Sequence, residues 1–313
     1  MNWKKRIVSL ALAAVIGLST FLASGVEAEA AGAIAKGIDV SKYQGAINWS
    51  AVAAEGYSFA FIKVGSAKSG LDPYFAANMV GANAAGLKTG VYLYSYATTV
   101  EAAMAEAQFT LAAIAPFTVS MPVVFDLEDA VHKTMTPEQL QALTVVFCSI
   151  IQSAGYQPMV YSSKNWLTQR VGPIPFDVWV AQYAEACEYP NPAFWQFSNS
   201  GTVSGIDGRV DLNFQFKDYS NIIIPYGFTT RGGNTYFYNN YRMQYGWVDY
   251  EGNRYFMNAD GTLYTNGWLT DGVNTFYMDT KDGHMLHDLV NIQGKNYYFD
   301  VNGRSEERRV GKE

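Results

Sequence analysis

The chain has 313 residues, which is enough for one large domain or two smaller ones. With 49% hydrophobic residues it can bury a sizeable core, and its net charge of -6 argues against a general nucleic-acid binder, which would carry basic patches. Aromatic residues make up 15% of the chain, a content that suits a carbohydrate binder and an aromatic core equally well.

The first thirty residues have the three-part pattern of a secretory signal peptide. A basic start at 4–6 precedes an apolar stretch over 7–23, and 28–30 (Ala-Glu-Ala) offers small residues at the spacing that cleavage requires. The alternative is a single membrane anchor, because the apolar stretch is almost long enough to span a bilayer. The small residues favour cleavage, so residues 1–30 are predicted to be removed and the mature protein to be secreted, with no stable membrane span.

Between residues 36 and 220, short apolar runs alternate with helical patterns. Strands are predicted over 37–40, 59–64, 91–96, 123–128, 159–162, 178–183, 194–197 and 210–214. Helices are predicted over 50–55, 73–85, 100–114, 137–154 and 164–171. Eight strands interleaved with about five helices indicate an α/β fold, a parallel β/α barrel of the TIM type. Because helices are sparse after residue 172, the second half of the barrel is expected to be irregular.

The pattern changes at residues 221–226, which are predicted to be a linker. Over 227–303 a unit of roughly twenty residues recurs, with a Gly-Phe or Gly-Trp element, an aromatic pair and a turn that often contains Asp-Gly or Asn-Gly. Such turns are hairpin signals, and units of fixed period bury their faces against their neighbours. We therefore expect a β-hairpin repeat solenoid after the barrel.

The last ten residues, 304–313, break this repeat, because they are highly charged and lack aromatic residues. Their sequence, RSEERRVGKE, resembles the in-frame translation of a short-read sequencing adapter. We therefore expect this segment to be non-native and the gene to continue with further repeats. The alternative is a charged tail.

The two cysteines and three histidines do not have the spacing of a metal site, and no metal or other cofactor is predicted. Cys148 lies in an apolar helical run and is expected to be a buried free thiol, although its pairing with Cys187 stays open. His284 and His287 lie among the repeats and are expected at the surface.

Acidic residues lie at or near the ends of three predicted barrel strands: Asp39 on the first, Asp126 and Glu128 on the fourth, and Asp211 on the last. Active groups of such barrels lie where the strands end. Asp126 and Glu128 are two apart, so on a strand they face the same way. Two carboxylates in one pocket repel, and one then keeps its proton to higher pH, as the general acid of glycosidic bond cleavage must. The alternative is a pair of strand-end acids held in salt bridges.

The same region contains a series of recognisable motifs. They are KGIDVSKYQGAINW (36–49), FAFIKVG (59–65), GVYLYSYA (90–97), MPVVFDLED (121–129), VYSS (160–163), VWVAQY (178–183) and FWQFSNSGTVSGIDGRVDLN (194–213). Through them, residues 36–216 resemble the glycoside hydrolase family 25 lysozymes, the Chalaropsis-type muramidases. The resemblance implies an irregular β/α barrel that hydrolyses the β-1,4 bond between N-acetylmuramic acid and N-acetylglucosamine of peptidoglycan.

By position, the resemblance implies that Glu128 is the general acid and that Asp126 stabilises the transition state. Asp39 and Asp211 match the other acids of the family's pocket, with roles in positioning and pKa tuning, and the stereochemical course stays open. Candidate sugar contacts are Tyr43, Tyr94, Tyr96, Tyr161, Trp179, Tyr183, Trp195 and Gln196. For each of these, packing in the core is an equally good interpretation.

The repeats resemble the choline-binding or cell-wall-binding repeats of Gram-positive surface proteins, in which aromatic rings surround a cation. Candidate wall-ligand contacts are Trp247, Tyr255, Trp268, Phe276, Tyr277 and Tyr297. The position before each aromatic pair holds Arg254, Thr275 or Asn296, where choline binders commonly place Trp. This departure leaves choline, teichoic acid and other wall polymers open as ligands. The alternative is that the rings mainly hold the hairpins together.

The expected function is therefore that of a secreted, cell-wall-associated muramidase whose partners are peptidoglycan and a wall polymer. Three other functions are less consistent with the sequence. An inactive adhesin would not need the intact set of acids, and an amidase would want a zinc site that the sequence lacks. A chitinase-like barrel would want a longer acidic run on the fourth strand, where Met121, Pro122 and Val124 stand instead. Whether the enzyme acts on its owner's wall or on that of competitors stays open.

Overall fold

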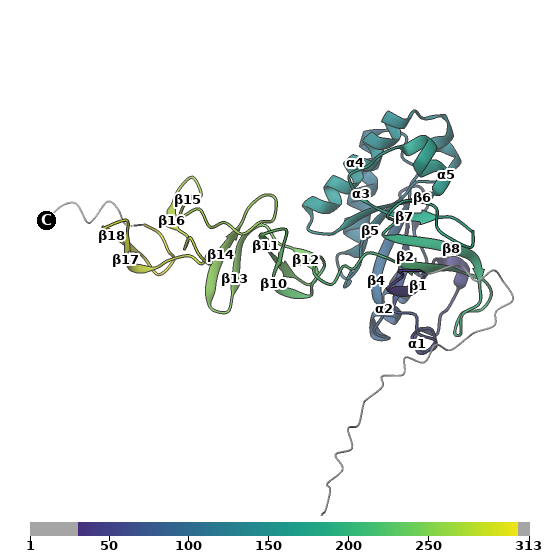
Figure 1. The fold of residues 1–313 in the computed structure, drawn as a ribbon, viewed down its shortest axis with the longest axis horizontal. Coiled ribbons are helices and arrows are strands. Elements are labelled where there is room, and N and C mark those ends of the chain that lie inside the picture. Colours follow the sequence, from purple (N-terminus) through teal and green to yellow (C-terminus); the bar gives the residue numbers. More distant parts are fainter. Residues whose placement is uncertain (1–30, 306–313) are drawn as a thin grey trace, which may run out of the picture.

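The computed structural model describes residues 31–305. Figure 1 shows a rounded region of helices and strands from which a row of small hairpins extends. The predicted signal peptide and residues 306–313 of the predicted non-native tail lie outside the described residues.

Eight strands close into a barrel in the rounded region. They are β1 (Ala35–Val40), β2 (Phe59–Ser66), β4 (Lys88–Tyr94), β5 (Val123–Asp126), β6 (Pro158–Ser163), β7 (Asp177–Ala181), β8 (Phe194–Gly201) and β9 (Val210–Gln215). Around the barrel their order is β1-β9-β8-β7-β6-β5-β4-β2, and β2 pairs with β1 to close it. A two-residue strand, β3 (Gly70–Leu71), folds back on β2.

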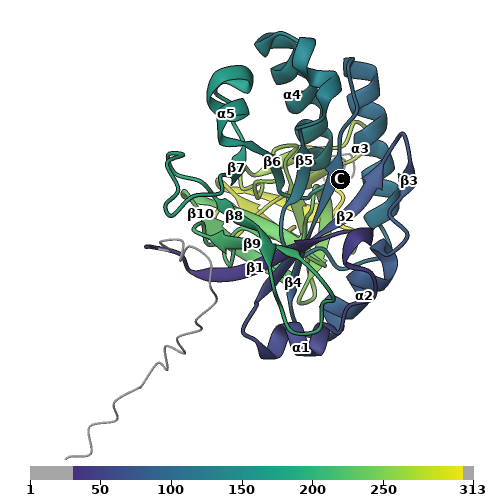
Figure 2. The ribbon, with the colours of Figure 1, turned by 90° about the vertical axis from the view of Figure 1, so that its right-hand side faces the viewer.

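Helices cover the outside of the first half of the barrel (Figure 2). They are α1 (Trp49–Ala54), α2 (Phe75–Ala84), α3 (Val100–Ile114), α4 (Pro137–Ser153) and α5 (Lys164–Trp166), with short turns η1 (Lys42–Gln44), η2 (Ala130–Thr134) and η3 (Leu167–Val171). From residue 172 to Gln215 the chain forms only strands and loops, so the predicted irregular second half is confirmed.

The last strand corrects the prediction of a parallel barrel, because β9 runs antiparallel to both of its neighbours, β1 and β8. The reason lies in the connection. A parallel neighbour needs a crossover of a dozen or more residues, usually a helix, whereas β8 and β9 are joined only by the loop 202–209. The short loop returns the chain along the same edge and forces the antiparallel direction.

Side chains that face the barrel interior change from apolar to polar along each strand. On β2, Phe61 packs on Trp179 of β7 with ring centroids 4.6 Å apart, and two residues later Lys63 lines an open cavity. On β5, Val124 is buried in the apolar interior, and two residues later Asp126 lines the cavity. Since alternate residues of a strand face the same side, the interior has an apolar floor and a polar mouth.

Gly37 of β1 shows how tightly this floor is packed. A Cβ atom at Gly37 would lie 2.3 Å from the ring of Phe59, so only glycine leaves room for that ring. The two residues pair directly in the β1–β2 register. Two positions further along β1, the inward side chain is Asp39.

Four small sheets follow the barrel. They contain β10 (Tyr226–Arg231), β11 (Asn234–Asn239) and β12 (Arg242–Met243), then β13 (Gly246–Tyr250) with β14 (Asn253–Met257), β15 (Trp268–Thr270) with β16 (Thr275–Tyr277), and β17 (Asp288–Ile292) with β18 (Lys295–Phe299). The predicted row of hairpins is thus confirmed.

Successive hairpins are joined by one recurring backbone contact. The N–H groups of Leu263, Met285 and Ser305 donate to carbonyls of an earlier hairpin, each over 2.7 Å. Leu263 and Met285 carry apolar side chains into the hairpin clusters. Ser305 occupies the third position with a buried hydroxyl that has no hydrogen-bond partner among the described residues. The backbone repeat therefore continues to Ser305, while its side chain departs from the pattern.

The first hairpin docks on the barrel at the end of α4. Arg242 and Tyr245 donate side-chain hydrogen bonds to the carbonyls of Ala154 and Gln152, and the N–H of Met243 donates to the carbonyl of Gly155. The last carbonyls of a helix lack partners within the helix, so these contacts cap α4 from outside. Gly155 permits the approach, because a Cβ there would lie 2.3 Å from the carbonyl oxygen of Met243.

Candidate active site

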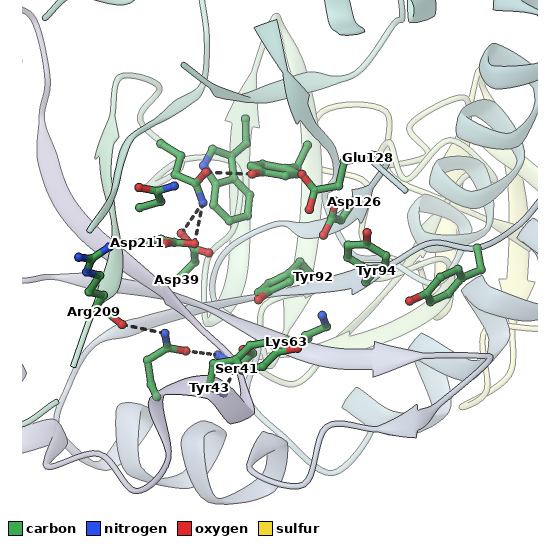
Figure 3. Close-up of a pocket in the computed structure, with 16 residues that line it drawn as sticks. Asp39, Ser41, Tyr43, Lys63, Tyr92, Tyr94, Asp126, Glu128, Arg209 and Asp211 are labelled. Carbon is green, nitrogen blue, oxygen red and sulfur yellow. Dashed lines mark hydrogen bonds between the residues drawn. The ribbon is translucent and has the colours of Figure 1, made fainter. Parts of the chain in front are cut away.

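A cavity of about 510 Å³ opens at the polar mouth of the barrel. Figure 3 shows two pairs of acids in it: Asp39 of β1 with Asp211 of β9, and Asp126 of β5 with Glu128, which follows β5. The lining residues are Asp39, Ser41, Tyr43, Gln44, Lys63, Tyr92, Tyr94, Tyr96, Asp126, Glu128, Tyr161, Trp179, Gln196, Asn199, Arg209 and Asp211. The four acids predicted from the sequence thus share one cavity.

Asp126 ends β5, and Glu128 lies two residues beyond the strand, which corrects the prediction that both lie on it. The extended backbone nevertheless continues for one residue, because the N–H of Leu127 donates to the carbonyl of Tyr161 and Leu127 is fully buried. Glu128 therefore still faces the cavity. Asp126 is only 3% exposed, whereas Glu128 is exposed at the cavity and within reach of a ligand.

Burial raises the pKa of Asp126 well above its usual value, and the neighbouring charge of Glu128 raises it further. Burial also raises the pKa of Glu128. The Lys63 ammonium opposes both shifts. Asp126 has one buried carboxylate oxygen, Oδ1, without a hydrogen-bond partner among the described residues. The pair can therefore hold a proton at a pH where exposed carboxyls have lost theirs.

Asp39 and Asp211 are direct neighbours in the β1–β9 register. Asp211 lies near the start of its strand, and it reaches the cavity only because β9 is antiparallel. Asn213 and Gln196 each donate a side-chain hydrogen bond to Asp39, over 2.8 and 3.0 Å. Burial, followed by the charge of Asp211, raises the pKa of Asp39, and burial raises that of Asp211.

Six of the eight candidate sugar contacts line the cavity: Tyr43, Tyr94, Tyr96, Tyr161, Trp179 and Gln196. Tyr183 follows β7 with 55% of its surface exposed, and its hydroxyl donates to Gln196. The structure corrects the prediction of Trp195 as a sugar contact. Its side chain is completely buried in a separate apolar cluster with Val178 and Val180, so it is a core residue. It neighbours Gln196 on a strand and must face the opposite side.

Several cavity residues were not anticipated from the sequence. They are Ser41, Gln44, Lys63, Tyr92, Asn199 and Arg209. Lys63 did carry a signal, because it is the only charged residue in the apolar run 59–64. Asn213, which orients Asp39, stands two residues after Asp211 and therefore on the same face of β9.

Most of the candidate wall-ligand residues pack against other rings. Phe276 is buried and contacts Trp247 with centroids 4.9 Å apart, which corrects its prediction as a ligand contact. The Arg254 guanidinium lies 5.1 Å from the Trp247 ring centroid. Tyr255 packs edge-on against Phe228 of the first hairpin.

Another ring cluster of the repeats centres on Trp268, which is 38% exposed. Its ring lies 5.0 Å from that of Tyr277 and 4.9 Å from that of Tyr297, which belongs to the following hairpin. The contacts between hairpins show that these rings hold neighbouring units together.

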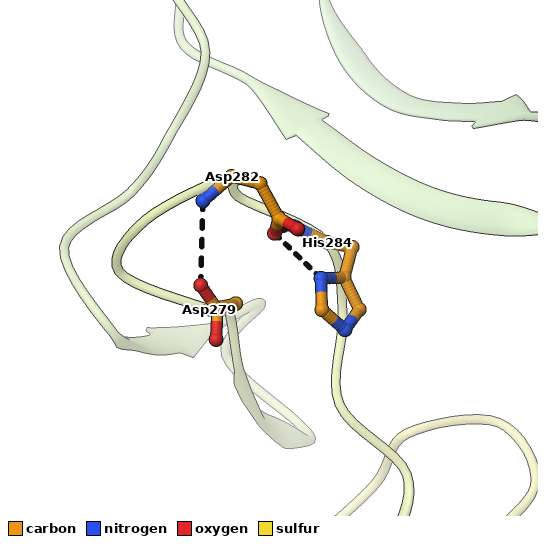
Figure 4. A group of neighbouring side chains, drawn as sticks. All are labelled: Asp279, Asp282 and His284. Atoms are coloured by element: carbon orange, nitrogen blue, oxygen red, sulfur yellow. Dashed lines mark hydrogen bonds and ion pairs between the residues drawn. The ribbon is translucent and has the colours of Figure 1, made fainter.

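Asp279, Asp282 and His284 gather at one hairpin turn (Figure 4). The Oδ1 atom of Asp279 accepts the N–H of Lys281, and that of Asp282 accepts the N–H of His284. Aspartates commonly stabilise turns in this way, and the turn accounts for the arrangement without a metal. Elsewhere, Cys148 is a buried free thiol as expected, and Cys187 is also free.

Among residues 31–305, no helix is long and apolar enough to cross a membrane.

Comparison with known proteins places residues 38–206 in the family described as glycosyl hydrolases family 25. Lysozyme M1 of Streptomyces globisporus is 29% identical over 198 residues, covering 57% of this chain and 66% of the relative. The uncharacterized protein YegX of Escherichia coli K12 is 31% identical over 187 residues, covering 56% of this chain and 68% of the relative. The chain thus spans about two thirds of the length of these relatives.

Among solved structures, the bacterial lysozyme of Streptomyces coelicolor matches with a TM-score of 0.51 and 27% identity, covering 59% of this chain and 93% of that one. The matched portion corresponds in size to the barrel. The likeness therefore confirms the barrel fold and does not extend to the full row of hairpins.

Proposed function

Because this chain belongs to glycosyl hydrolases family 25, we propose that it is a secreted muramidase, which hydrolyses the β-1,4 bond between N-acetylmuramic acid and N-acetylglucosamine of peptidoglycan. The observation that carries the proposal is the cavity at the barrel mouth, in which four acids and several aromatic side chains come together. An acid that protonates the leaving oxygen and a second carboxylate are what glycosidic cleavage requires.

Glu128 is the proposed general acid. Its side chain is exposed to the cavity, so it can reach a bound leaving-group oxygen, and desolvation by the surrounding protein raises its pKa so that it keeps its proton. Since the acid must be protonated, we expect activity to be lost as the pH rises through this raised pKa.

Asp126 is proposed to stabilise the cationic sugar of the transition state. It is nearly fully buried beside Glu128, and it lines the cavity in which the sugar would bind. A carboxylate in such a low-dielectric position interacts more strongly with developing positive charge than an exposed one would. Asp39 and Asp211 are proposed to position the substrate and the other acids.

We further propose that the hairpins hold the enzyme on a wall polymer, with Trp268, Tyr277 and Tyr297 as the contact region. The partial exposure of Trp268 supports this choice. Conversely, Trp247 is a poor site for an external cation, because the Arg254 guanidinium already lies near its ring.

The test is mass analysis of muropeptides released from purified peptidoglycan. The wild-type protein should release fragments with muramic acid at the reducing end. Glu128→Gln should lower the rate by about a hundred- to ten-thousand-fold, because it removes the general acid while keeping the shape of the side chain. Glu185→Gln, which removes the same charge from an exposed loop residue, should keep full activity and is the matched control.

Reducing-end glucosamine or free peptides from the wild-type protein would overturn the proposed bond. Full activity in a folded Glu128→Gln protein would reject Glu128 as the acid. Wall binding by the wild-type protein without release of reducing ends would identify an adhesin instead of an enzyme.

A further inference from the structure

The side-chain carbonyl of Gln196 on β8 receives two tyrosine hydroxyls. Tyr161 of β6 donates over 2.9 Å, and Tyr183, in the loop after β7, donates over 3.0 Å. Gln196 is 2% exposed and Tyr161 is 7% exposed, whereas Tyr183 is 55% exposed. One donor is therefore fixed within the barrel wall, and the other comes from the solvent-exposed rim.

The amide nitrogen of Gln196 bridges two acids, Asp39 and Asp211. It donates to Asp39 over 3.0 Å and to Asp211 over 3.3 Å. Because two carboxylates this close repel each other, an amide that donates one hydrogen to each holds them together without adding a charge. The charged groups Lys63, Arg209, Asp126 and Glu128 also line the cavity, but none of them makes a hydrogen bond to this pair in the described structure.

A second amide repeats the arrangement at Asp39. Asn213 donates to Asp39 over 2.8 Å, and its own oxygen accepts the indole N–H of Trp179 over 2.8 Å. Since an indole nitrogen can only donate, the orientation of Asn213 is fixed. For Gln196 the two tyrosine hydroxyls do the same. If the amide turned over, its oxygen would face the acceptor oxygens of Asp39 and Asp211.

We propose that Gln196 is a positioning residue of the reaction and that Tyr183 acts through it, as one of two hydroxyls that hold the amide in the orientation that joins Asp39 to Asp211. This inference rests on the proposed muramidase function. It differs from the sequence-based interpretation of both residues as sugar contacts. A sugar contact supports binding of the substrate, whereas a positioning residue supports the chemical step.

A double-mutant cycle separates the two roles. Gln196→Met keeps the length of the side chain and removes its donors and acceptor. It should lower kcat by about ten- to a hundredfold, as loss of hydrogen bonds to charged groups does, and leave KM within about twofold. Tyr183→Phe alone should lower kcat by about three- to tenfold, because Tyr161 still holds the amide.

In the Gln196→Met protein, adding Tyr183→Phe should change kcat by less than about twofold, because the hydroxyl no longer has an amide to orient. Tyr43→Phe is the control, since Tyr43 lines the cavity, is 78% exposed and is not a hydrogen-bond partner of Gln196. Whatever factor Tyr43→Phe produces in the wild-type protein should recur unchanged in the Gln196→Met protein.

A second set of variants leaves Gln196 in place, in case Gln196→Met does not fold. Tyr161→Phe and Tyr183→Phe together remove both hydroxyls, so the loss in kcat should exceed the product of the two single losses. Independent, multiplicative losses in either cycle, or effects confined to KM, would overturn the inference. A wild-type protein that releases no reducing ends would instead overturn the proposed function, so the two failures are distinguishable.

Discussion

The barrel and the row of hairpins use aromatic residues in opposite ways. In the barrel, Phe61 and Trp179 stack inside a closed wall, and this apolar floor leaves the strand ends free to carry polar groups. In the hairpins, rings such as Trp268 and Tyr297 meet across the boundary between neighbouring units, and the two small apolar clusters each combine side chains of adjacent hairpins. A closed sheet can therefore support a buried polar site, whereas each hairpin depends on its neighbours for a core.

The boundary between the two regions can be tested by truncation, which should give the largest effect on stability. A chain that ends at Pro225 loses the contacts of Arg242, Met243 and Tyr245 with the end of α4. Three hydrogen bonds at about 1 kcal/mol each should lower the Tm of the barrel by about 5 °C or more. Differential scanning calorimetry measures this, with a chain that ends at Tyr245 as the control.

The control should melt within about 2 °C of the barrel transition of the full chain, because it keeps the docked hairpin. Equal Tm values for the two truncations would show that the first hairpin belongs energetically to the repeats and not to the barrel.

Trp268→Ala should weaken binding to the wall through the hairpins and leave catalysis in the barrel unchanged. It removes the exposed tryptophan ring of the proposed contact region, so sedimentation with purified walls should require about tenfold more wall material. The rate on a short soluble glycan should stay the same, because the cavity is untouched. Leu289→Ala, at a residue 69% exposed in the last hairpin, should leave both properties unchanged. Unchanged wall sedimentation in Trp268→Ala would remove this cluster from the proposed contact region.

Asp126→Asn tests how much the buried charge of Asp126 lowers the free energy of unfolding. The pKa of Asp126 is raised in the folded protein, so the folded state binds this proton more tightly than the unfolded chain does. Stability is therefore lost as the pH rises from the unfolded value through the folded one, and the ionised carboxylate destabilises the fold at pH 7. Asp126→Asn should raise the free energy of unfolding at pH 7 by on the order of 1 kcal/mol.

Denaturant unfolding at several pH values measures this gain, which should shrink as the pH approaches the unfolded pKa of about 4. A gain that is the same at pH 4 and pH 7 would show that charge is not its origin. Activity should fall in the same variant.

Ser305→Met should have the smallest effect. It places an apolar side chain at the position that Leu263 and Met285 fill in the earlier repeats, and it removes a buried hydroxyl that has no partner within residues 31–305. We expect a gain of about 1 kcal/mol in the last hairpin, measured by hydrogen exchange of its strand amides. Protection that falls in this variant would mean that the position is not equivalent to the other two.

Local sequence signals predicted the elements well. The predicted helix 137–154 is α4, which Thr136 caps at its start and Gly155, with a φ of 87°, follows at its end. The acids were also found, but partly for the wrong reason. Glu128 faces the cavity from a loop, and Asp211 from the start of an antiparallel strand. Strand direction is decided by loop length and closure of the whole sheet, which a local pattern does not contain.

Side chains that act through others were the hardest to predict. Trp195 and Gln196 are neighbours, yet one packs outside the barrel and the other orients acids inside it. Alternation predicts that they face opposite sides, but only the assembled barrel shows which side is the cavity. In the hairpins, the local sequence around Phe276 does not distinguish a buried ring from an exposed one. Phe276 is buried because Trp247 of the preceding hairpin packs against it.

The antiparallel β9 also has a consequence for how often one bound molecule can act. It begins at the cavity with Asp211 and ends at the opposite edge of the barrel, where the chain continues into the docked hairpin. Figure 2 faces the barrel with the hairpins behind it. A polymer held by the hairpins would thus lie away from the bond being cut, so a cut would not release the enzyme from its anchor. The number of bonds cut during one binding event would then depend on how long the hairpins stay bound to the wall polymer. It would not depend on how fast the cavity releases each product.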